Sequence, residues 1–193
     1  MSDAARIDVL DVNRRYTYAD YLEWEGKERY QLINGEAFQM ASPSVTHQAL
    51  LGEVFYQFYS WLRGKPCQVF ASPLDVRLFP KKDKSDNTVV QPDMLVVCDK
   101  NKIDKGSING APDLVIEIIS PSNTHSDLFL KFQYYLKAGV REYWVIDPEQ
   151  KKVQVHIYEN DHYISTMYED NASIPVTVLS GFTITLDDLW TKI

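Results

Sequence analysis

Apolar residues recur at helical spacing in two stretches of the chain. In the first, "HQALLGEVFYQFYSWLRG", they fall three or four positions apart and predict an amphipathic helix over about 47–63, which Gly64 and Pro66 end. Its apolar positions are Leu50, Leu51, Val54, Phe55, Phe58, Trp61 and Leu62. In the second stretch, the same spacing predicts a helix over about 126–138, with Gly139 as its C-cap.

Shorter apolar and alternating runs predict the strands of a sheet. Single strands are expected over 67–79 (with a bend at Pro73), 89–97, 112–119 and 141–147. Hairpins are expected over 29–40 and 152–169, because Asn34–Gly35 and Asn160–Asp161 can take the positive φ angles of tight turns. A short helix is expected after Thr17, since Asp20 completes a capping-box-like pattern.

The order of these elements predicts the fold class. After an N-terminal hairpin come a helix, three strands, a second helix and a further strand, followed by a C-terminal hairpin extension. This order predicts an α/β fold in which a mixed β-sheet is flanked by helices. A chain of 193 residues suits one domain, which we expect to span residues 1–193 with its core over about 47–148.

Composition and charge narrow the class of protein. Hydrophobic residues make up 45% and charged residues 24%, as in ordinary globular proteins. We expect neither a secretory signal nor a membrane span, because no apolar run approaches the roughly 20 residues that cross a bilayer. The net charge of −7 argues against a general polyanion binder but leaves room for a local basic cleft. Cys67 and Cys98 form no CxxC motif, so we expect two free thiols in a reduced cytoplasmic protein.

One acid interrupts the most apolar of the predicted strands, "DLVIEIIS". Successive side chains of a strand point to opposite faces, and both faces here are apolar, so we expect both to be covered. An unpaired carboxylate buried there would cost several kcal/mol. Glu117 therefore needs a cationic partner, a metal ion, or a position at the strand end that reaches water.

A second acid, Asp93, follows Pro92 at the start of the apolar run "QPDMLVV". An Asp in such a place commonly caps a turn. If it instead lies beside Glu117 on a neighbouring strand, the two carboxylates repel each other, and a divalent cation removes that penalty. Mg²⁺ suits such a site because it takes one or two protein carboxylates together with waters and phosphate oxygens.

The predicted helix over 126–138 offers a cation. Its apolar face holds Leu128, Phe129, Phe132, Tyr135 and Leu136, and its outer face holds Gln133 and Lys137. Lys131 belongs to neither face and shares a stripe with Asp127. It either forms a solvated ion pair with Asp127 or points at the two acids, where its ammonium could hold an attacking water or balance transition-state charge.

Together these stretches resemble a known class of enzyme. A "PD" pair, a spacer, an acid inside an apolar strand and a strand-to-helix turn are similar to the PD-(D/E)XK nuclease superfamily. More specifically, the chain resembles the Uma-two family of restriction endonucleases. The matching stretches run from about Thr17 to the C-terminus and are "YQLINGE", "SPSVTHQ", "PLDVRL", "VQPDMLVV", "APDLVIEIISPSN" and "YYLKAGVREYWVIDP". The resemblance implies a restriction-endonuclease-like core and Mg²⁺-dependent cleavage of DNA phosphodiester bonds, with Mn²⁺ as a substitute metal.

The resemblance also implies roles for individual residues. Asp93 and Glu117 match the two motif acids and, with the backbone carbonyl of Ile118, would hold Mg²⁺. The motif Lys would stand at Ile119, and in the Uma-two pattern a helix Lys replaces it, which here is Lys131. The implied reaction is in-line attack of a hydroxide on the phosphate, leaving 5′-phosphate and 3′-hydroxyl ends.

Weaker candidates lie earlier in the chain. Glu36 follows the Asn34–Gly35 turn and either reaches the metal as a further ligand or is an exposed hairpin acid. His47, at the start of the first long helix, contacts a substrate phosphate, assists a proton transfer or is structural. The lysines of "PKKDKSDN" either contact a DNA backbone or belong to a solvated loop.

Two other functions stay open at this point. The displaced Lys and the negative net charge favour a nuclease-fold domain that binds DNA or protein without cleaving. A hydrolase of small phosphoesters would show as a cavity too narrow for a duplex. DNA is the partner we expect, and a homodimer is expected because two cuts in a duplex usually need two active sites.

Overall fold

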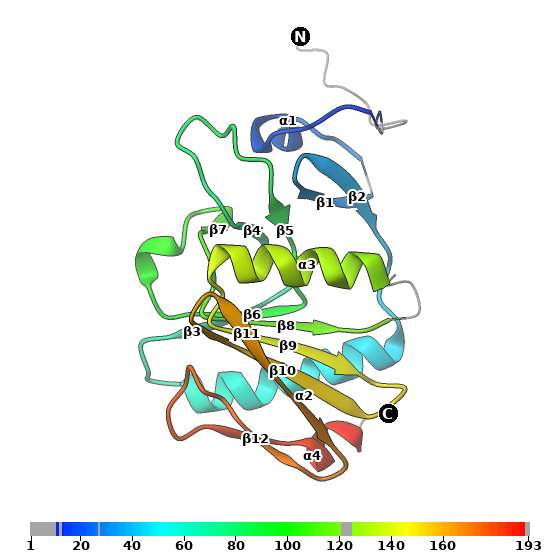
Figure 1. The fold of residues 1–193 in the computed structure, drawn as a ribbon, viewed down its shortest axis with the longest axis vertical. Helices are drawn as coiled ribbons and strands as arrows, with labels where there is room; N and C mark the ends of the chain where they lie inside the picture. The colour runs from blue at the N-terminus through cyan, green and yellow to red at the C-terminus, as the bar shows by residue number, and fades with distance from the viewer. Residues whose placement is uncertain (1–10, 12, 27, 121–124, 192–193) are drawn as a thin grey trace.

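Two β-sheets carry most of the structure, a computed structural model that describes residues 11, 13–26, 28–120 and 125–191 (Figure 1). In order across the larger sheet, the strands are β11 (His162–Glu169), β10 (Lys152–Glu159), β9 (Glu142–Asp147), β8 (Leu114–Ile118), β6 (Met94–Val97) and β3 (Gln68–Ala71). In order across the smaller sheet, they are β2 (Glu36–Met40), β1 (Arg29–Ile33), β5 (Val89–Val90), β4 (Asp75–Arg77) and β7 (Ser107–Asn109). A separate pair joins β12 (Ser173–Pro175) to β13 (Thr183–Thr185).

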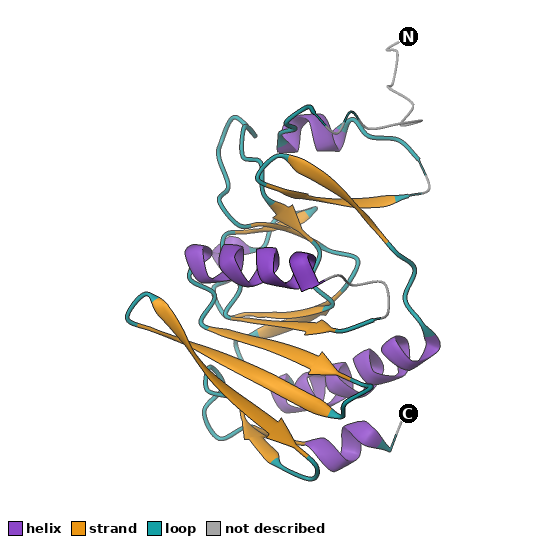
Figure 2. Cartoon of the chain, turned by 45° about the vertical axis from the view of Figure 1, so that its right-hand side comes forward, coloured by secondary structure: helices purple, strands orange, loops and turns teal. Residues whose placement is uncertain are grey.

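Two long helices cover opposite faces of the larger sheet (Figures 1 and 2). The helices are α1 (Tyr18–Leu22), α2 (Val45–Leu62), α3 (His125–Ala138) and α4 (Leu186–Trp190), with a 3₁₀ turn over Lys100–Lys102. Because side chains alternate along β6, Met94 and Val96 pack in the α2 core, whereas Leu95 and Val97 pack in the core that contains Tyr135 of α3. No helix in the described ranges is long and apolar enough to span a bilayer.

The expected α/β fold, a mixed sheet flanked by helices, is confirmed, but the predicted strands divide between two sheets. The run over 67–79 bends at Pro73, and β3 and β4 on either side of the bend join different sheets. The run over 89–97 divides in the same way, because β5 ends before Gln91 and β6 starts after Asp93. The N-terminal hairpin β1–β2 is therefore the edge of a second sheet rather than an appendage of the first.

Local sequence signals place most element ends correctly. Thr17 and Asp20 form the full capping box of α1, and Asn34 and Asn160 take the expected positive φ angles of +53° and +48°. Helix α2 begins at Val45 rather than at His47, because the hydroxyl of Ser44 accepts a hydrogen bond from the His47 amide at 3.1 Å. The assignment of Phe129 to the apolar face of α3 is wrong, since this residue is 60% exposed.

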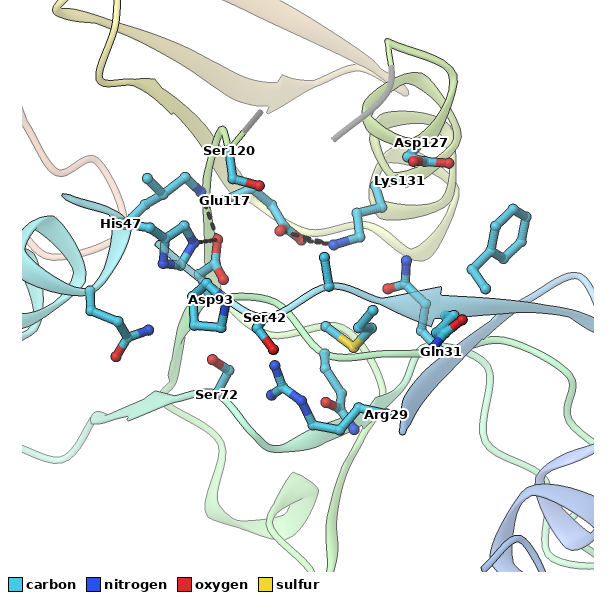
Figure 3. A pocket seen from close by; sticks show the side chains of 18 residues that line it. Arg29, Gln31, Ser42, His47, Ser72, Asp93, Glu117, Ser120, Asp127 and Lys131 are labelled. Carbon is cyan, nitrogen blue, oxygen red and sulfur yellow. Dashed lines mark hydrogen bonds and ion pairs between the residues drawn. The ribbon is translucent and has the colours of Figure 1, made fainter. Parts of the chain in front are cut away.

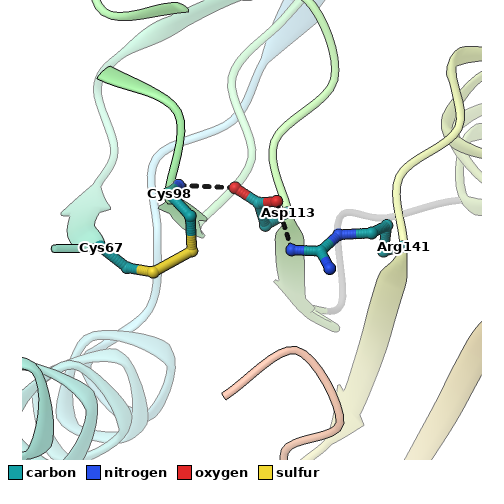
Figure 4. Close-up of a disulfide and its surroundings, with 4 residues drawn as sticks. All are labelled: Cys67, Cys98, Asp113 and Arg141. Carbon is teal, nitrogen blue, oxygen red and sulfur yellow. Dashed lines mark hydrogen bonds and ion pairs between the residues drawn. A yellow bond between two sulfur atoms is a disulfide. The ribbon is translucent and has the colours of Figure 1, made fainter. Parts of the chain in front are cut away.

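The two cysteines form a disulfide, which corrects the expectation of free thiols (Figure 4). Cys67 precedes β3 and Cys98 follows β6, and the antiparallel register that pairs Gln68 with Val97 sets the two cysteines opposite each other. Asp113 accepts hydrogen bonds from the Cys98 amide and from the Arg141 guanidinium beside this bridge. The sequence separation of 31 residues hides this contact, because it arises from strand pairing and not from a local motif.

A buried ion pair ties the loop between β4 and β5 to the smaller sheet. Arg77 on β4 donates to both carboxylate oxygens of Asp86, whose side chain is fully buried, and the Lys81 amide donates to the same carboxylate. The Arg77 guanidinium also lies 4.3 Å from the ring centroid of Tyr18, so it links the loop to α1. Burial alone would raise the pKa of Asp86, but the hydrogen bonds from Arg77 and the Lys81 amide, together with the charge of Arg77, outweigh burial and hold the pKa below its usual value.

We expect Asp86→Ala to lower the free energy of unfolding by about 3–5 kcal/mol, because it leaves the Arg77 charge buried without its partner. The matched control is Asp83→Ala in the same loop, where the carboxylate is exposed and accepts hydrogen bonds from the nearby Ser85, so the change in stability should be small. Urea unfolding of the two variants measures both values. Equal effects of the two substitutions would contradict the assignment of Asp86 as the anchor of this loop.

Candidate active site

The register of two antiparallel strands sets two acids side by side. Strand β6 pairs with β8 so that Met94 lies opposite Ile116. Asp93 immediately precedes Met94 and Glu117 immediately follows Ile116, so the two acids lie opposite each other at this end of the strand pair. Asp93 is fixed further by the Ile118 amide, which donates to its Oδ2 atom at 2.8 Å.

Lys131 of α3 reaches the second of these acids. Its Nζ atom lies 2.9 Å from both carboxylate oxygens of Glu117, and the two residues are only 5% and 4% exposed. Of the two arrangements that the sequence left open for Lys131, the structure has the one in which the ammonium points toward the acids (Figure 3). The three residues expected at the site, Asp93, Glu117 and Lys131, are thus brought together from two strands and a helix.

Tyr135 is a member of the site that the sequence reasoning missed. It lies one helical turn after Lys131, and its hydroxyl donates a hydrogen bond of 2.7 Å to Glu117 Oε1. The apolar stripe of α3 had suggested that Tyr135 served the core alone. The available signal was the four-residue spacing from Lys131, which points both side chains to the same side of the helix.

Burial governs the protonation of this cluster. It raises the pKa of Glu117, the positive charge of Lys131 opposes that rise, and the nearby negative charge of Asp93 adds to it, leaving the pKa above its usual value. Burial and the charge of Glu117 also raise the pKa of Tyr135 well above its usual value. Tyr135 therefore remains a neutral hydroxyl that donates to Glu117.

His47 contacts the first acid from the other side of the sheet. It lies in the first turn of α2, and its Nε2 atom is 3.1 Å from Asp93 Oδ2. The imidazole is 6% exposed, and its Nδ1 atom has no hydrogen-bond partner among the described residues. His47 therefore orients Asp93, and its other ring nitrogen is buried without a hydrogen-bond partner among the described residues.

A cavity of about 180 Å³ opens between these groups and the N-terminal hairpin (Figure 3). The core wall carries Asp93, Glu117, Ile118, Ser120, Asp127 and Lys131. The hairpin wall carries Arg29, Gln31, Phe38, Gln39 and Met40, continued by Ala41, Ser42 and Pro43. His47, Gln48, Ser72 and Gln91 complete the lining.

Two groups of candidates from the sequence lie away from this cavity. Glu36, expected as a further metal ligand, is not among the lining residues and pairs with Arg15 at 2.6 Å on the surface. The lysines of "PKKDKSDN" are exposed on the loop before β5 and do not line the cavity either. The structure therefore brings neither group to the acids, because the β1–β2 turn and this loop both lie at the far side of the smaller sheet.

The chemistry of the cavity fits a small number of oxygen ligands for a metal ion. Among the described residues, no group of three or more His, Cys, Asp and Glu side chains is arranged to hold a metal. Of the three carboxylates that line the cavity, Asp93 and Glu117 lie side by side, and one such pair suits Mg²⁺, which keeps several waters. Because the ammonium of Lys131 contacts both oxygens of Glu117, a bound cation would have to share this carboxylate with Lys131.

Comparison with solved structures identifies the fold. The chain has a TM-score of 0.75 to the crystal structure of a "putative nuclease belonging to DUF820" from Anabaena variabilis, over 92% of this chain and 98% of that one. The two sequences are 22% identical, so this likeness shows the fold alone. The larger sheet, its flanking helices and the second sheet thus form the same α/β architecture as that protein.

The sequence comparison identifies the family. Residues 18–187 match the model of the Uma-two family, which is described as "Putative restriction endonuclease". The match covers most of the chain, and the protein belongs to this family, as its motifs predicted. An uncharacterized protein of Synechocystis sp., slr1290, is 23% identical over 145 residues, which are 74% of this chain and 73% of that protein.

We expect Tyr135→Phe to lower the free energy of unfolding by about 1.5–3 kcal/mol, because it removes a hydrogen bond to a buried charged group while the ring stays in place. Tyr134→Phe is the matched control, since Tyr134 is half-buried on the same helix and its hydroxyl has no hydrogen bond in the described part of the chain. Urea unfolding compares the two. If both substitutions have the same small effect, the Tyr135 hydroxyl does not support Glu117.

Proposed function

We propose that this protein is a Mg²⁺-dependent endonuclease that hydrolyses DNA phosphodiester bonds, with Mn²⁺ able to replace Mg²⁺. The observation that carries the proposal is the convergence of Asp93, Glu117 and Lys131 at one cavity. Membership of a family described as "Putative restriction endonuclease" supports the same reaction. Because a double-strand cut needs two such sites, we propose a homodimer as the cleaving form.

The two acids would hold the metal ion, together with the Ile118 carbonyl. When bound there, Mg²⁺ would polarise the scissile phosphate and lower the pKa of a water molecule. The Ile118 amide and His47 fix the position of Asp93, and Tyr135 and Lys131 fix that of Glu117. These four contacts hold both carboxylates in place before any ligand arrives, which reduces the cost of ordering them during the reaction.

Lys131 is the group proposed to act on the reacting atoms. Its ammonium is held at the acids and lines the cavity, so it can hold the attacking water or balance the negative charge that develops on the phosphate. The position where the superfamily motif has its Lys holds Ile119, and Lys131 approaches the acids from the following helix instead. An ammonium from either element would serve the same charge balance.

A second candidate function is a nuclease-fold domain that binds DNA or another protein without cleaving it. The contact of Lys131 with both oxygens of Glu117 favours this alternative, because it already neutralises one of the two acids that the metal would need. The net charge of −7 favours a protein partner for such a domain, since it weakens binding to the phosphates of a nucleic acid backbone.

A plasmid-nicking assay separates the two candidates. With Mg²⁺ or Mn²⁺ the wild type should convert supercoiled plasmid to the nicked form, and excess EDTA should stop the reaction. Glu117→Gln and Lys131→Met should each slow nicking by at least about 100-fold, because each removes a group that acts on the transition state. Lys137→Met is the matched control, since Lys137 lies exposed on the outer face of α3 and should leave the rate unchanged.

Metal binding gives a readout that does not depend on cleavage. Titration of Mn²⁺ into the wild type by calorimetry should show binding that Asp93→Asn weakens at least about tenfold, because one of two carboxylate ligands is lost. Thermal unfolding of each variant shows that the fold is retained. A wild type that shifts plasmid in a gel but cleaves none with either metal would support the non-cleaving alternative.

A further inference from the structure

The β1–β2 hairpin presents one face to the cavity, opposite the two acids. Arg29 and Gln31 are two residues apart on β1, so their side chains point to the same face. The antiparallel register pairs Gln31 with Phe38 and Arg29 with Met40 on that face. All four residues line the cavity, so the hairpin offers a cation, an amide and an aromatic ring toward Glu117 and Lys131.

Gln31 carries an unusual polar atom. The residue is 7% exposed, and its Oε1 atom is buried without a hydrogen-bond partner among the described residues. Leaving a buried amide oxygen unpaired costs about 1–3 kcal/mol. In Figure 3 Gln31 lies on the hairpin wall, across the cavity from Lys131 on the core wall. The unpaired Nδ1 atom of His47 is a second buried polar atom in the same lining.

We propose that this hairpin face, formed by Arg29, Gln31 and Phe38, recognises a nucleobase next to the scissile phosphate. The Gln31 amide would hydrogen-bond the edge of the base, because it can both donate and accept. The half-buried ring of Phe38 would stack on the base, and Arg29 would bind a backbone phosphate. This inference rests on the proposed function and defines its substrate as a nucleic acid strand whose base is unstacked.

The burial of the site is the reason for requiring an unstacked base. Glu117, Lys131 and Gln31 are all more than nine-tenths buried, on opposite walls of a cavity of about 180 Å³. Cavities that enclose whole drug-sized ligands measure about 300–1,000 Å³, so this one takes a fragment such as a single base or phosphate. A base that is paired and stacked in a duplex cannot reach Gln31 while its phosphate lies at the acids, unless it leaves the stack.

The charge of the protein favours the same substrate. Duplex DNA carries about one negative charge per 1.7 Å, and binding it depends on many Lys and Arg contacts. The cavity lining includes Arg29 and Lys131 as permanent cations, and the whole chain has a net charge of −7. Recognition of single strands draws more on base stacking, which contributes about 1–3 kcal/mol per base.

Fluorescence anisotropy with a non-cleaving parent tests this inference. The parent is full-length Glu117→Gln, and the probes are labelled homopolymers of deoxyadenylate, deoxycytidylate and thymidylate and a duplex of equal length. Single strands should bind at least about tenfold more tightly than the duplex, with a preference among the bases. Adding Gln31→Met should weaken the preferred strand by about 5- to 100-fold and remove the preference, because the amide makes the base contacts.

Three further variants assign the contacts within the hairpin face. Phe38→Leu should weaken all single strands by a similar factor, since stacking is tolerant of base identity. Arg29→Met should also weaken all strands and reduce the slope of affinity against salt by about one. Gln68→Met is the matched control, because Gln68 is an exposed amide on β3 outside the cavity and should change nothing. If Gln31→Met does not fold, Phe38→Leu and Arg29→Met carry the test.

Three results would overturn the inference. The first is that the duplex binds as tightly as the single strands. The second is that Gln31→Met binds the strands as tightly as its parent does. The third is that a deoxynucleoside monophosphate competes as well as the oligomer. The last result would instead support a hydrolase of small phosphoesters. These outcomes are separate from failure of the proposed function, because the nicking assay on the wild type tests whether the protein cleaves at all, whatever Gln31 contributes. Nicking without a role for Gln31 would refute base recognition alone.

Discussion

The buried contact of Lys131 with Glu117 is the interaction on which the site depends. A carboxylate in the middle of a covered sheet is tolerated only because an ammonium and a hydroxyl of α3 reach it there. That requirement fixes the rotation of α3 on the sheet, since Lys131 and Tyr135 must both face β8. The backbone pairing of β6 with β8 separately sets Asp93 beside Glu117. The charge balance of Glu117 thus links a helix to this strand pair.

Much of this site could be predicted from the sequence, because its signals are local conflicts. An acid in an apolar strand and a lysine outside both the apolar and the polar face of a helix each break the pattern around them. Gln31 breaks the apolar pattern of "YQLI" in the same way, but it was not among the predicted site residues. The division of two strand runs between sheets could not be predicted, since it depends on which neighbours each half meets after the bend. The sequence also did not predict four short elements, because they are too short to show a hydrophobic period. These are strands β7, β12 and β13 and helix α4.

The two sheets have separate tasks around one cavity. The larger sheet and α3 hold the acids and the ammonium, whereas the hairpin at the edge of the smaller sheet forms the opposite wall. The loop held by Arg77 and Asp86 leads directly into β5, which pairs with β1 of that hairpin. The position of the hairpin wall therefore depends on an ion pair that touches neither the acids nor the cavity. Glu36, which sequence reasoning placed at the metal, lies at the turn of this hairpin, beyond reach of the acids.

The disulfide closes a covalent ring around the segment that joins the two sheets. The chain between Cys67 and Cys98 contains β3, β4, β5 and β6 together with Asp93, so both sheets and one of the acids belong to this ring. A ring of this length stabilises the folded protein by about 3–4 kcal/mol, because it lowers the conformational entropy of the unfolded chain. Asp93 itself is held from outside the ring, by the Ile118 amide and by His47. Reduction of the disulfide would thus raise the entropy of the unfolded chain and lower the stability of the protein. It would leave the contacts of Asp93 with the Ile118 amide and with His47 in place.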